Sequence, residues 1–395
     1  MPAPSACALE RTKVACQLCF RQPKGKTQMH KVSIHPQWTI KQADGQMLSL
    51  RLLALLVQVH EHGSLSAACR QSGASYRHAW ELVRSGEVMF GAPLLDMERG
   101  KGSKLTALGE TLVWADRRIA ARLNPALASL SSELEVAIGR VVTTDPAPLR
   151  VHASHGFAVE KLLDALVLQH VPVECKYVGS LEAVASLHDG GCDLAGFHVP
   201  IGDFEGHVLE DYARWLDSRT CRVICTVVRR QGLIVAAGNP RKIYDVRDLC
   251  RPDVRFMNRQ RGSGTRLLLE CLLAQAGIDS GAIHGFEHGE YTHAAVAAYV
   301  ASGMADVGLG VETPARQFNL DFIPIASERY FLLGYANALD QPQLKTLLDI
   351  LRSQDFRDSV NRLPGHSFTD SGAIQTLSQA FPGRKFPQKP KASNR

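Results

Sequence analysis

The spacing of apolar residues divides the chain into a helical N-terminal part and a C-terminal part in which strands and helices alternate. Between residues 47 and 138, leucine, valine and alanine recur every three or four positions, which is the period of amphipathic helices. From residue 149 onward, short β-branched runs alternate with helical patterns. This alternation predicts an α/β sheet with ligand sites at the carboxyl ends of its strands. The expected fold class is therefore mixed, with an all-α domain followed by an α/β domain.

Three helices are predicted at the start of the folded part. They span Met47–His62, Leu65–Gln71 and Tyr76–Gly86. Gly63 should end the first helix, and Ser64 and Ser75 should cap the second and third with their side-chain oxygens. A helix, a short helix, a glycine turn and a further helix form the layout of a helix-turn-helix, and any small three-helix domain is the alternative.

A glycine-rich basic segment follows these helices and ends near residue 110. Two short extended pieces around a basic tip predict a wing, so residues 41–110 would form an all-α winged helix-turn-helix domain. Side chains at the start of the last helix would read base edges of double-stranded DNA, and the wing would neutralise its phosphates. The predicted DNA-binding residues are Ser64, Ser75, Tyr76, Arg77, His78, Arg84, Arg99, Lys101 and Lys104.

Several short runs in this domain carry a resemblance to a known family. They are Gly63-Ser64-Leu65-Ser66-Ala67-Ala68, Ser75-Tyr76-Arg77-His78-Ala79-Trp80, Arg99-Gly100-Lys101-Gly102 and Leu105-Thr106-x-x-Gly109. These residues resemble the N-terminal domain of ModE-type molybdate-responsive regulators, which is itself similar to LysR-type winged helices. The resemblance covers roughly residues 45–140 and implies DNA binding. The small molybdate modules that follow in ModE are absent from the rest of the sequence.

The helical pattern continues beyond the wing. One helix should end near Arg122 and a second should span Pro125–Ile138. Residues 111–138 would join two copies of the chain into a homodimer or a higher homo-oligomer, and a bundle within one chain is the alternative. Three further segments complete the organisation: a flexible basic arm at 1–40 with an irregular edge strand at Val32–Ile40, a linker at 139–148, and a basic disordered tail at 383–395.

Residues 149–382 are predicted to form a two-lobed effector domain. The β-branched segment Arg219–Asn239 would carry the chain into the second lobe, and strands at Phe322–Pro324 and Arg329–Tyr335 would return it. Such crossovers resemble the type II periplasmic-binding-protein fold that LysR-type regulators use as a sensor. Three runs are also similar to a domain attached to ModE-like regions and to molybdopterin-biosynthesis proteins: Asn258–Arg266, Thr292-His293-x-x-Val296-Ala297 and Ala305-Asp306-Val307-Gly308-Leu309-Gly310.

The loop Asn258–Arg266 carries the strongest chemical signal. It connects a predicted strand to a helix and holds three arginines among Gly-Ser-Gly-Thr, which suits an anion held by a helix N-terminus. The alternative is a solvated connection. Other strand-to-helix junctions should meet this loop in a cleft. The predicted effector-binding residues are Ser154, His155, His198, Arg261, Ser263, Gly264, Thr265, Arg266, Thr292 and His293. Asp306 is predicted to be structural, and for Glu312 both roles stay open.

Composition narrows the class of protein. The 395 residues carry a formal net charge of +6 and ten scattered cysteines, which favour a cytoplasmic protein with reduced thiols. No secretory signal or membrane span is predicted, and the pair Cys16 and Cys19 has no second metal-binding pair. No catalytic triad, metal set or nucleotide fingerprint is present, so neither an enzyme nor a resident cofactor is expected.

The combined prediction is a ligand-responsive transcriptional regulator whose effector is a small oxyanion, such as molybdate or tungstate, or an anion related to the molybdenum cofactor. The alternative is a cytoplasmic enzyme or anion carrier of molybdopterin metabolism that uses the same cleft.

Overall fold

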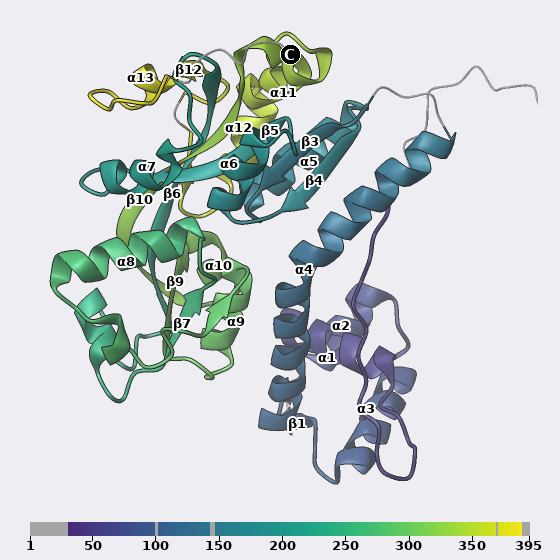
Figure 1. Ribbon diagram of the computed structural model, residues 1–395. Helices are drawn as coiled ribbons and strands as arrows, with labels where there is room; N and C mark the ends of the chain where they lie inside the picture. Colours follow the sequence, from purple (N-terminus) through teal and green to yellow (C-terminus); the bar gives the residue numbers. More distant parts are fainter. Residues whose placement is uncertain (1–30, 99–101, 143–146, 369, 389–395) are drawn as a thin grey trace, which may run out of the picture.

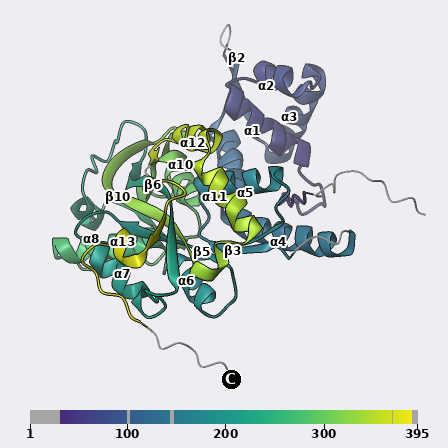
Figure 2. The same cartoon turned by 90° about the horizontal axis from the view of Figure 1, so that it is seen from above.

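The computed structural model describes residues 31–98, 102–142, 147–368 and 370–388. A small helical domain stands apart from a larger α/β domain, and one long helix runs between them (Figures 1 and 2). Within these ranges, helices of sufficient length lack the apolar character that a membrane crossing requires. Cys16 and Cys19, with the rest of residues 1–30, lie outside the described residues.

The small domain is the predicted winged helix-turn-helix. It consists of α1 (Leu50–His62), α2 (Leu65–Ser72), α3 (Tyr76–Phe90) and the hairpin of β1 (Leu95–Glu98) with β2 (Gly102–Leu105). The apolar face read from the sequence forms its core, where Leu52, Leu56 and Val83 are fully buried. Ser64 caps α2 by accepting a hydrogen bond from the Ala67 amide at 3.2 Å. Ser75 precedes α3 but makes no side-chain capping bond, so that prediction is wrong.

The two helices predicted over residues 111–138 are one helix, α4 (Ala107–Val142). The predicted interruption at Pro125 does not occur, because residues on both sides of the proline keep the helical conformation, although α4 changes direction along its length (Figure 1). Pro125 lacks an N–H for the carbonyl of Ala121, four residues earlier, and that carbonyl instead accepts a hydrogen bond from the Thr292 hydroxyl at 3.0 Å. The linker is consequently shorter than the predicted 139–148, since α4 extends to Val142.

The last residues of the predicted flexible arm lie against α4. The Val32 amide donates to the Glu135 carboxylate at 2.7 Å, and the Trp38 indole donates to Asp116 at 2.8 Å. The strand predicted at Val32–Ile40 is wrong, because residues 31–40 are irregular and pair with no strand in the described ranges. Trp38 and Ile40 instead pack on the core of the small domain.

The α/β domain is built on one mixed sheet of ten strands among the described residues. Its first lobe comprises β3 (Leu149–Ala153), α5 (Phe157–Leu168), β4 (Val173–Tyr177), α6 (Ser180–His188), β5 (Leu194–Pro200), α7 (Glu205–Ala213), and the C-terminal η3 (Ala336–Ala338), α11 (Pro342–Arg352), α12 (Gln354–Asn361), β11 (His366–Ser367), β12 (Ile374–Thr376) and α13 (Leu377–Ala380). The second lobe comprises η1 (Val246–Cys250), β7 (Phe256–Arg259), α8 (Gly264–Ala276), η2 (Ser280–Ala282), β8 (Gly289–Glu290), α9 (His293–Ala301), β9 (Val307–Val311) and α10 (Glu312–Gln317).

Two long antiparallel strands join the lobes, β6 (Cys221–Val235) and β10 (Asp321–Tyr335). They occupy the middle of the strand order β4-β3-β5-β10-β6-β9-β7-β8, so each lobe extends from one end of the pair. The two strands predicted at Phe322–Pro324 and Arg329–Tyr335 are therefore one strand. Register shifts beside Pro324 and after Tyr330 let the proline stay within it without donating a ladder hydrogen bond.

The start of the predicted disordered tail is ordered. Phe386 packs against Phe381 with 5.9 Å between ring centroids, and the Ser218 amide donates to the Pro387 carbonyl at 3.1 Å. These contacts place residues 383–388 on the first lobe. The aromatic side chain of Phe386 buries apolar surface there, which holds the segment against the domain. Residues 389–395 lie outside the described residues.

Candidate functional site

The exposed start of α3 is the first candidate surface. Residues 71–78 are all exposed, while Ala79 and Val83 face the domain core. The side chain of Arg77 is 90% exposed and pairs only loosely with Glu81 at 3.2 Å. This geometry leaves the first turn of α3 free to enter a DNA groove. The exposed predicted residues of this helix and its N-terminus are Ser75, Tyr76, Arg77, His78 and Arg84.

The wing is fixed to the helices beside this surface. The buried Ser103 hydroxyl accepts a hydrogen bond from the Leu65 amide at 2.8 Å, which ties β2 to the start of α2. Lys104, on the same strand, is exposed. The Ser64 hydroxyl is already engaged in capping α2. Two of the predicted wing residues, Arg99 and Lys101, lie outside the described residues.

The second candidate site is a cavity of about 450 Å³ between the two lobes. Ser154 and His155, after β3, line one wall, and Arg259 and Arg261, at the end of β7 and in its loop, line the other. Ligands of α/β sheets bind at the carboxyl ends of strands, where these residues lie. The lobes touch beside the cavity, since a Cβ on Gly179 would lie 3.1 Å from the Gly262 carbonyl oxygen.

Arg259 is the buried charge of this cavity, with only 2% of its surface exposed. Its Nε donates to the Glu290 carbonyl at 3.1 Å and its Nη2 to the Tyr291 carbonyl at 3.0 Å. Its Nη1 is buried without a hydrogen-bond partner among the described residues. A buried cation that lacks a hydrogen-bonded counter-charge is unfavourable, so the site is suited to receive an anion.

The charged states of the groups around Arg259 also favour binding of an anion. Burial, together with the charge of Arg229, lowers the pKa of Arg259 to about 9, so its guanidinium remains protonated at neutral pH. Burial also holds the pKa values of His198 and His293 well below their usual range, with Arg229 and Arg259 adding to the effect. These histidines are therefore neutral at pH 7, and arginine supplies the positive charge.

The strands that join the lobes contribute a polar cluster next to Arg259. Arg229 donates from Nε to the Glu328 carboxylate, and the Gln231 amide donates to Glu328 at 2.8 Å and to the Thr265 hydroxyl at 2.9 Å. The second Glu328 oxygen, the Gln231 side-chain oxygen and the Tyr330 hydroxyl are buried without partners in the described part of the chain. Unpaired buried polar atoms on the connecting strands mark a region where polar ligand groups or water can be accommodated.

The structure brings only some of the predicted effector residues to the cavity. Ser154, His155 and Arg261 line it, and Ser154 also lines a smaller adjoining space with His198. Arg261 lies at the rim, where its side chain is 80% exposed and pairs with Glu287 at 2.6 Å. His155 pairs with Glu160 at 2.8 Å.

The other predicted residues lie outside these linings and make internal contacts. Ser263 caps α8 by accepting from the Arg266 amide, and a Cβ on Gly264 would lie 3.1 Å from that of His198. Arg266 donates to the Phe286 carbonyl, pairs with Glu270 and lies over the Phe286 ring. The remaining internal partners are the Gln231 amide for Thr265, the Ala121 carbonyl for Thr292 and the Val311 amide for His293.

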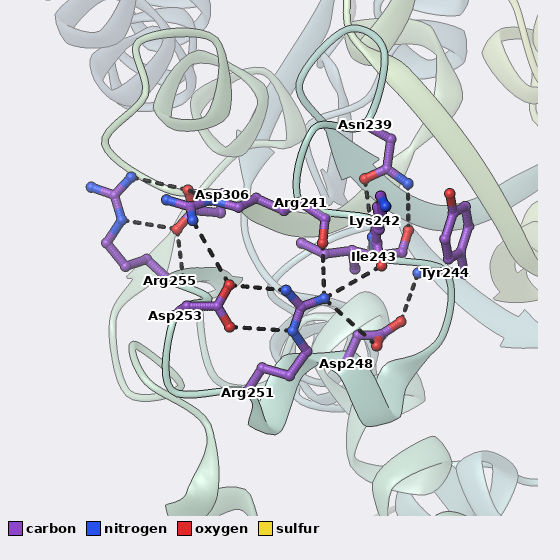
Figure 3. A network of polar contacts seen from close by, with 10 residues as sticks. All are labelled: Asn239, Arg241, Lys242, Ile243, Tyr244, Asp248, Arg251, Asp253, Arg255 and Asp306. Carbon is purple, nitrogen blue, oxygen red and sulfur yellow. Dashed lines mark hydrogen bonds and ion pairs between the residues drawn. The ribbon is translucent and has the colours of Figure 1, made fainter.

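Asp306 has the structural role that its sequence context predicts. Figure 3 shows its carboxylate between Arg255 and Arg241, at 2.9 Å and 3.3 Å, on the side of a network that also holds Arg251 and Asp253. The main partner of each arginine is a carboxylate of the same lobe, so the network stabilises the second lobe. Glu312 is likewise occupied, because it pairs with Arg230 and Arg316.

Sequence reasoning missed Arg229, Gln231, Glu328 and Tyr330 and did not include Arg259 among the site residues. One signal was available. Arg229-Arg230-Gln231 interrupts a strand of otherwise β-branched and apolar residues, and charged residues inside a central strand need buried partners.

Comparisons with known proteins divide the chain in the same way as the structure. Residues 50–110 match the model of bacterial regulatory helix-turn-helix proteins of the lysR family. Residues 164–352 match the model of the PBP superfamily domain. Among solved structures, OxyR from Corynebacterium glutamicum is similar at 16% identity with a TM-score of 0.40, over 80% of this chain and 94% of that one.

Three curated relatives match parts of the chain. YvgK from Bacillus subtilis is 31% identical over 207 residues, which is 52% of this chain and 66% of YvgK. An uncharacterised protein from the 5′ region of a ferredoxin gene of Clostridium pasteurianum is 36% identical over 28% of this chain and 98% of its own length. The molybdenum-pterin-binding protein MopB from Rhodobacter capsulatus is 32% identical over 23% of this chain and 36% of MopB.

The helix-turn-helix, its exposed recognition surface and the two-lobed domain with a cleft agree with both family models. The chain thus joins a segment that matches the helix-turn-helix domain of the lysR family, residues 50–110, to one that matches the PBP superfamily domain, residues 164–352.

Proposed function

We propose that the protein is a cytoplasmic transcriptional regulator that binds double-stranded DNA through α3 and the wing and responds to a small anion in the inter-lobe cleft. The observation that carries the proposal is the buried Arg259, whose Nη1 lacks a hydrogen-bond partner within the described residues. Arg259 lines the cavity of the α/β domain, and this domain is attached to the winged helix-turn-helix domain. A bound anion would supply the missing counter-charge and would draw the two walls of the cleft together.

The effector we propose is an oxyanion such as molybdate or tungstate, or an anion related to the molybdenum cofactor. The buried guanidinium supports an anionic group, and the name of MopB supports molybdenum chemistry. A cavity of about 450 Å³ has room for a body larger than a single four-oxygen ion. No resident cofactor is proposed.

A homodimer or a higher homo-oligomer is the proposed assembly. Four apolar residues of α4 lie at spacings of seven, four and four residues and are exposed by 38–49%: Leu123, Leu130, Leu134 and Ile138. An apolar stripe of this length on one helix favours association with a second copy. Two recognition helices held by such a pair would contact two half-sites of DNA.

A DNA titration tests this function. The full-length protein is titrated by fluorescence anisotropy into labelled DNA from upstream of its own gene, with a scrambled duplex of equal length as control. The titration is repeated with sodium molybdate, tungstate, sulfate, inorganic phosphate and acetate. Sequence-preferring binding that weakens with salt and changes with one of these anions supports the proposal. Equal binding to both duplexes under every condition contradicts it.

A further inference from the structure

The helix α4 is attached to the second lobe along its N-terminal half. Arg118 lies over the Tyr299 ring of α9 at 5.4 Å, and Arg122 pairs with Glu290 at 3.7 Å. The contact closest to the cleft is the hydrogen bond from the Thr292 hydroxyl to the Ala121 carbonyl at 3.0 Å. The second lobe therefore holds α4 through side chains and through one main-chain carbonyl.

The same helix is attached to the first lobe along its C-terminal half. The outer side of the edge strand β4 pairs with no other strand of the described sheet. Serine hydroxyls of α4 accept hydrogen bonds from two of its amides instead. Ser132 accepts from the Cys175 amide at 2.8 Å, and Ser129 accepts from the Tyr177 amide at 3.0 Å. Because these bonds take the place of a neighbouring strand, they fix α4 along the edge of the sheet.

Pro125 lies between the two sets of attachments. Ala121 and Ser132 are eleven residues apart, so they are separated by about 16 Å along the helix. Pro125 also lines the cleft cavity. Since it cannot donate to Ala121, it leaves free the carbonyl that Thr292 binds, and prolines are the usual sites at which helices bend. Figure 1 shows that α4 changes direction along its length.

The cleft is connected to this point through the main chain. Arg259 donates to the carbonyls of Glu290 and Tyr291, and the next residue is Thr292. An anion that moved the Arg259 side chain would move this segment as well. The segment ends at the residue that holds α4.

We propose that Pro125 is the hinge through which closure of the cleft bends α4, with Thr292 as the positioning residue that transmits the motion of the second lobe. This inference rests on the proposed function, because it takes closure of the cleft around an anion as the motion being transmitted. With Ala121 held by one lobe and Ser129 and Ser132 by the other, a change in the angle between the lobes changes the angle of α4 at Pro125. The winged domain precedes α4 in the chain and is joined to its N-terminal end, so it is reoriented together with the N-terminal half of α4.

Thr292 can be tested without destroying the cap of α9, where its hydroxyl also accepts from the Ala295 amide. In Thr292→Asp the carboxylate still accepts from that amide but cannot donate to Ala121. Thr292→Ser keeps both bonds and is the matched control. The readout is amide hydrogen exchange of the full-length protein by mass spectrometry, without any ligand, in peptides covering residues 117–129 and 173–178.

Thr292→Asp should accelerate exchange in both peptides by roughly fivefold, the effect of one lost hydrogen bond. Thr292→Ser should match the wild-type chain. Acceleration in the second peptide, which Thr292 does not touch, is what a merely local defect at α9 would not produce. Unchanged exchange in Thr292→Asp, or the same acceleration in Thr292→Ser, would overturn the inference.

Pro125→Ala gives a second test in which unfolding cannot mimic the effect. Alanine restores the N–H to Ala121 and favours the helix, so exchange in residues 117–129 should slow. The change in exchange that 1 mM molybdate or inorganic phosphate produces in this peptide should shrink in Pro125→Ala. An anion response as large as that of the wild-type chain would contradict the hinge. If neither anion alters exchange at Arg259 in the wild-type chain, the proposed effector fails. The ligand-free comparison of Pro125→Ala with the wild-type chain then decides the hinge, because unchanged exchange in residues 117–129 would still contradict it.

Discussion

Arg229 and Glu328 face each other in register across β6 and β10, and their side chains form an ion pair that is 7% and 0% exposed. The pair lies where the two lobes join, beside Arg259, whose Nη1 has no hydrogen-bond partner in the described part of the chain. The negative charge of Glu328 stabilises the buried guanidinium groups of Arg229 and Arg259. Burial lowers the pKa of Arg259, and the charge of Glu328 partly offsets this effect. The stability of the connecting strands and the charge of the cleft therefore depend on the same residue.

Loss of this carboxylate should destabilise the protein strongly. Glu328→Ala leaves Arg229 buried without its partner, and the free energy of unfolding of the α/β domain should fall by about 3–5 kcal/mol. Glu328→Gln keeps a hydrogen-bond acceptor and should lose less. Urea unfolding followed by circular dichroism measures both. The exposed pair of Lys31 and Asp164 supplies the control, since Asp164→Asn should change stability by under about 1 kcal/mol.

Arg259 should carry most of the anion affinity. Arg259→Met removes the guanidinium whose Nη1 lacks a partner among the described residues, and the affinity for the responding anion should fall by about 10- to 100-fold, as expected for a charged hydrogen bond. Isothermal titration calorimetry on the full chain gives the constant. Arg261→Ala is the matched control, because its exposed side chain is already paired with Glu287, and it should lose no more than about fivefold. A larger effect of Arg261→Ala than of Arg259→Met would reverse this assignment.

Substitutions on the proposed DNA-binding face should weaken DNA binding and leave anion binding unchanged. Arg77→Ala should weaken binding to the specific duplex by about 1–3 kcal/mol if it reads a base, and Lys104→Ala should reduce the slope of log affinity against log salt by about one. Neither change should alter anion binding. Lys345→Ala, on α11 of the first lobe, is a control of the same charge and should leave the DNA titration unchanged.

Stability should decline in mild acid. The pKa values of His198, His293 and His366 are lowered from an ordinary value near 6.5, mainly by burial and further by Arg229, and that of His366 falls to about 4. The unfolded chain therefore binds protons that the folded chain does not, so stability is fully present above pH 6.5 and is lost as pH falls toward 4. Urea midpoints at pH 7.5, 6 and 5 should decrease in that order. His366→Gln should flatten the profile; a profile as steep as that of the wild-type chain would exclude His366 as a source.

Association through α4 should depend on its apolar stripe. The double substitution Leu130→Glu and Leu134→Glu places two charges at the centre of the stripe and should convert the oligomer to monomer in sedimentation velocity experiments. Leu168→Glu, at a leucine of α5 that is more exposed than either, is the control and should leave the oligomer intact. A monomeric wild-type chain at micromolar concentration would contradict the proposed assembly.

The helical period and the alternation of strands and helices were sufficient to predict both domains and the order of most elements. Local patterns did not predict what happens at Pro125 or at Val32–Ile40. A proline in a helical pattern indicates a break, yet α4 continues because Thr292, 171 residues away in sequence, satisfies the carbonyl that the proline leaves free. An alternating segment indicates a strand, yet residues 32–40 pair with no strand that the structure describes.

The candidate site, too, could be predicted only in part from local sequence patterns. Local residue types were enough to predict that an arginine-rich loop opens a helix at the end of a strand, and that a helix-turn-helix precedes it. Which arginine faces the cleft could not be predicted in this way, because burial and pairing depend on partners distant in the chain. Arg266 turns to Phe286 and Glu270, Arg261 pairs with Glu287 at the rim, and Arg259 is left with an unpaired nitrogen beside Arg229 and Glu328. The spacing of apolar residues along the chain predicts helices and strands. The net charge and pairing of side chains in the cleft depend instead on which residues the two folded lobes bring together.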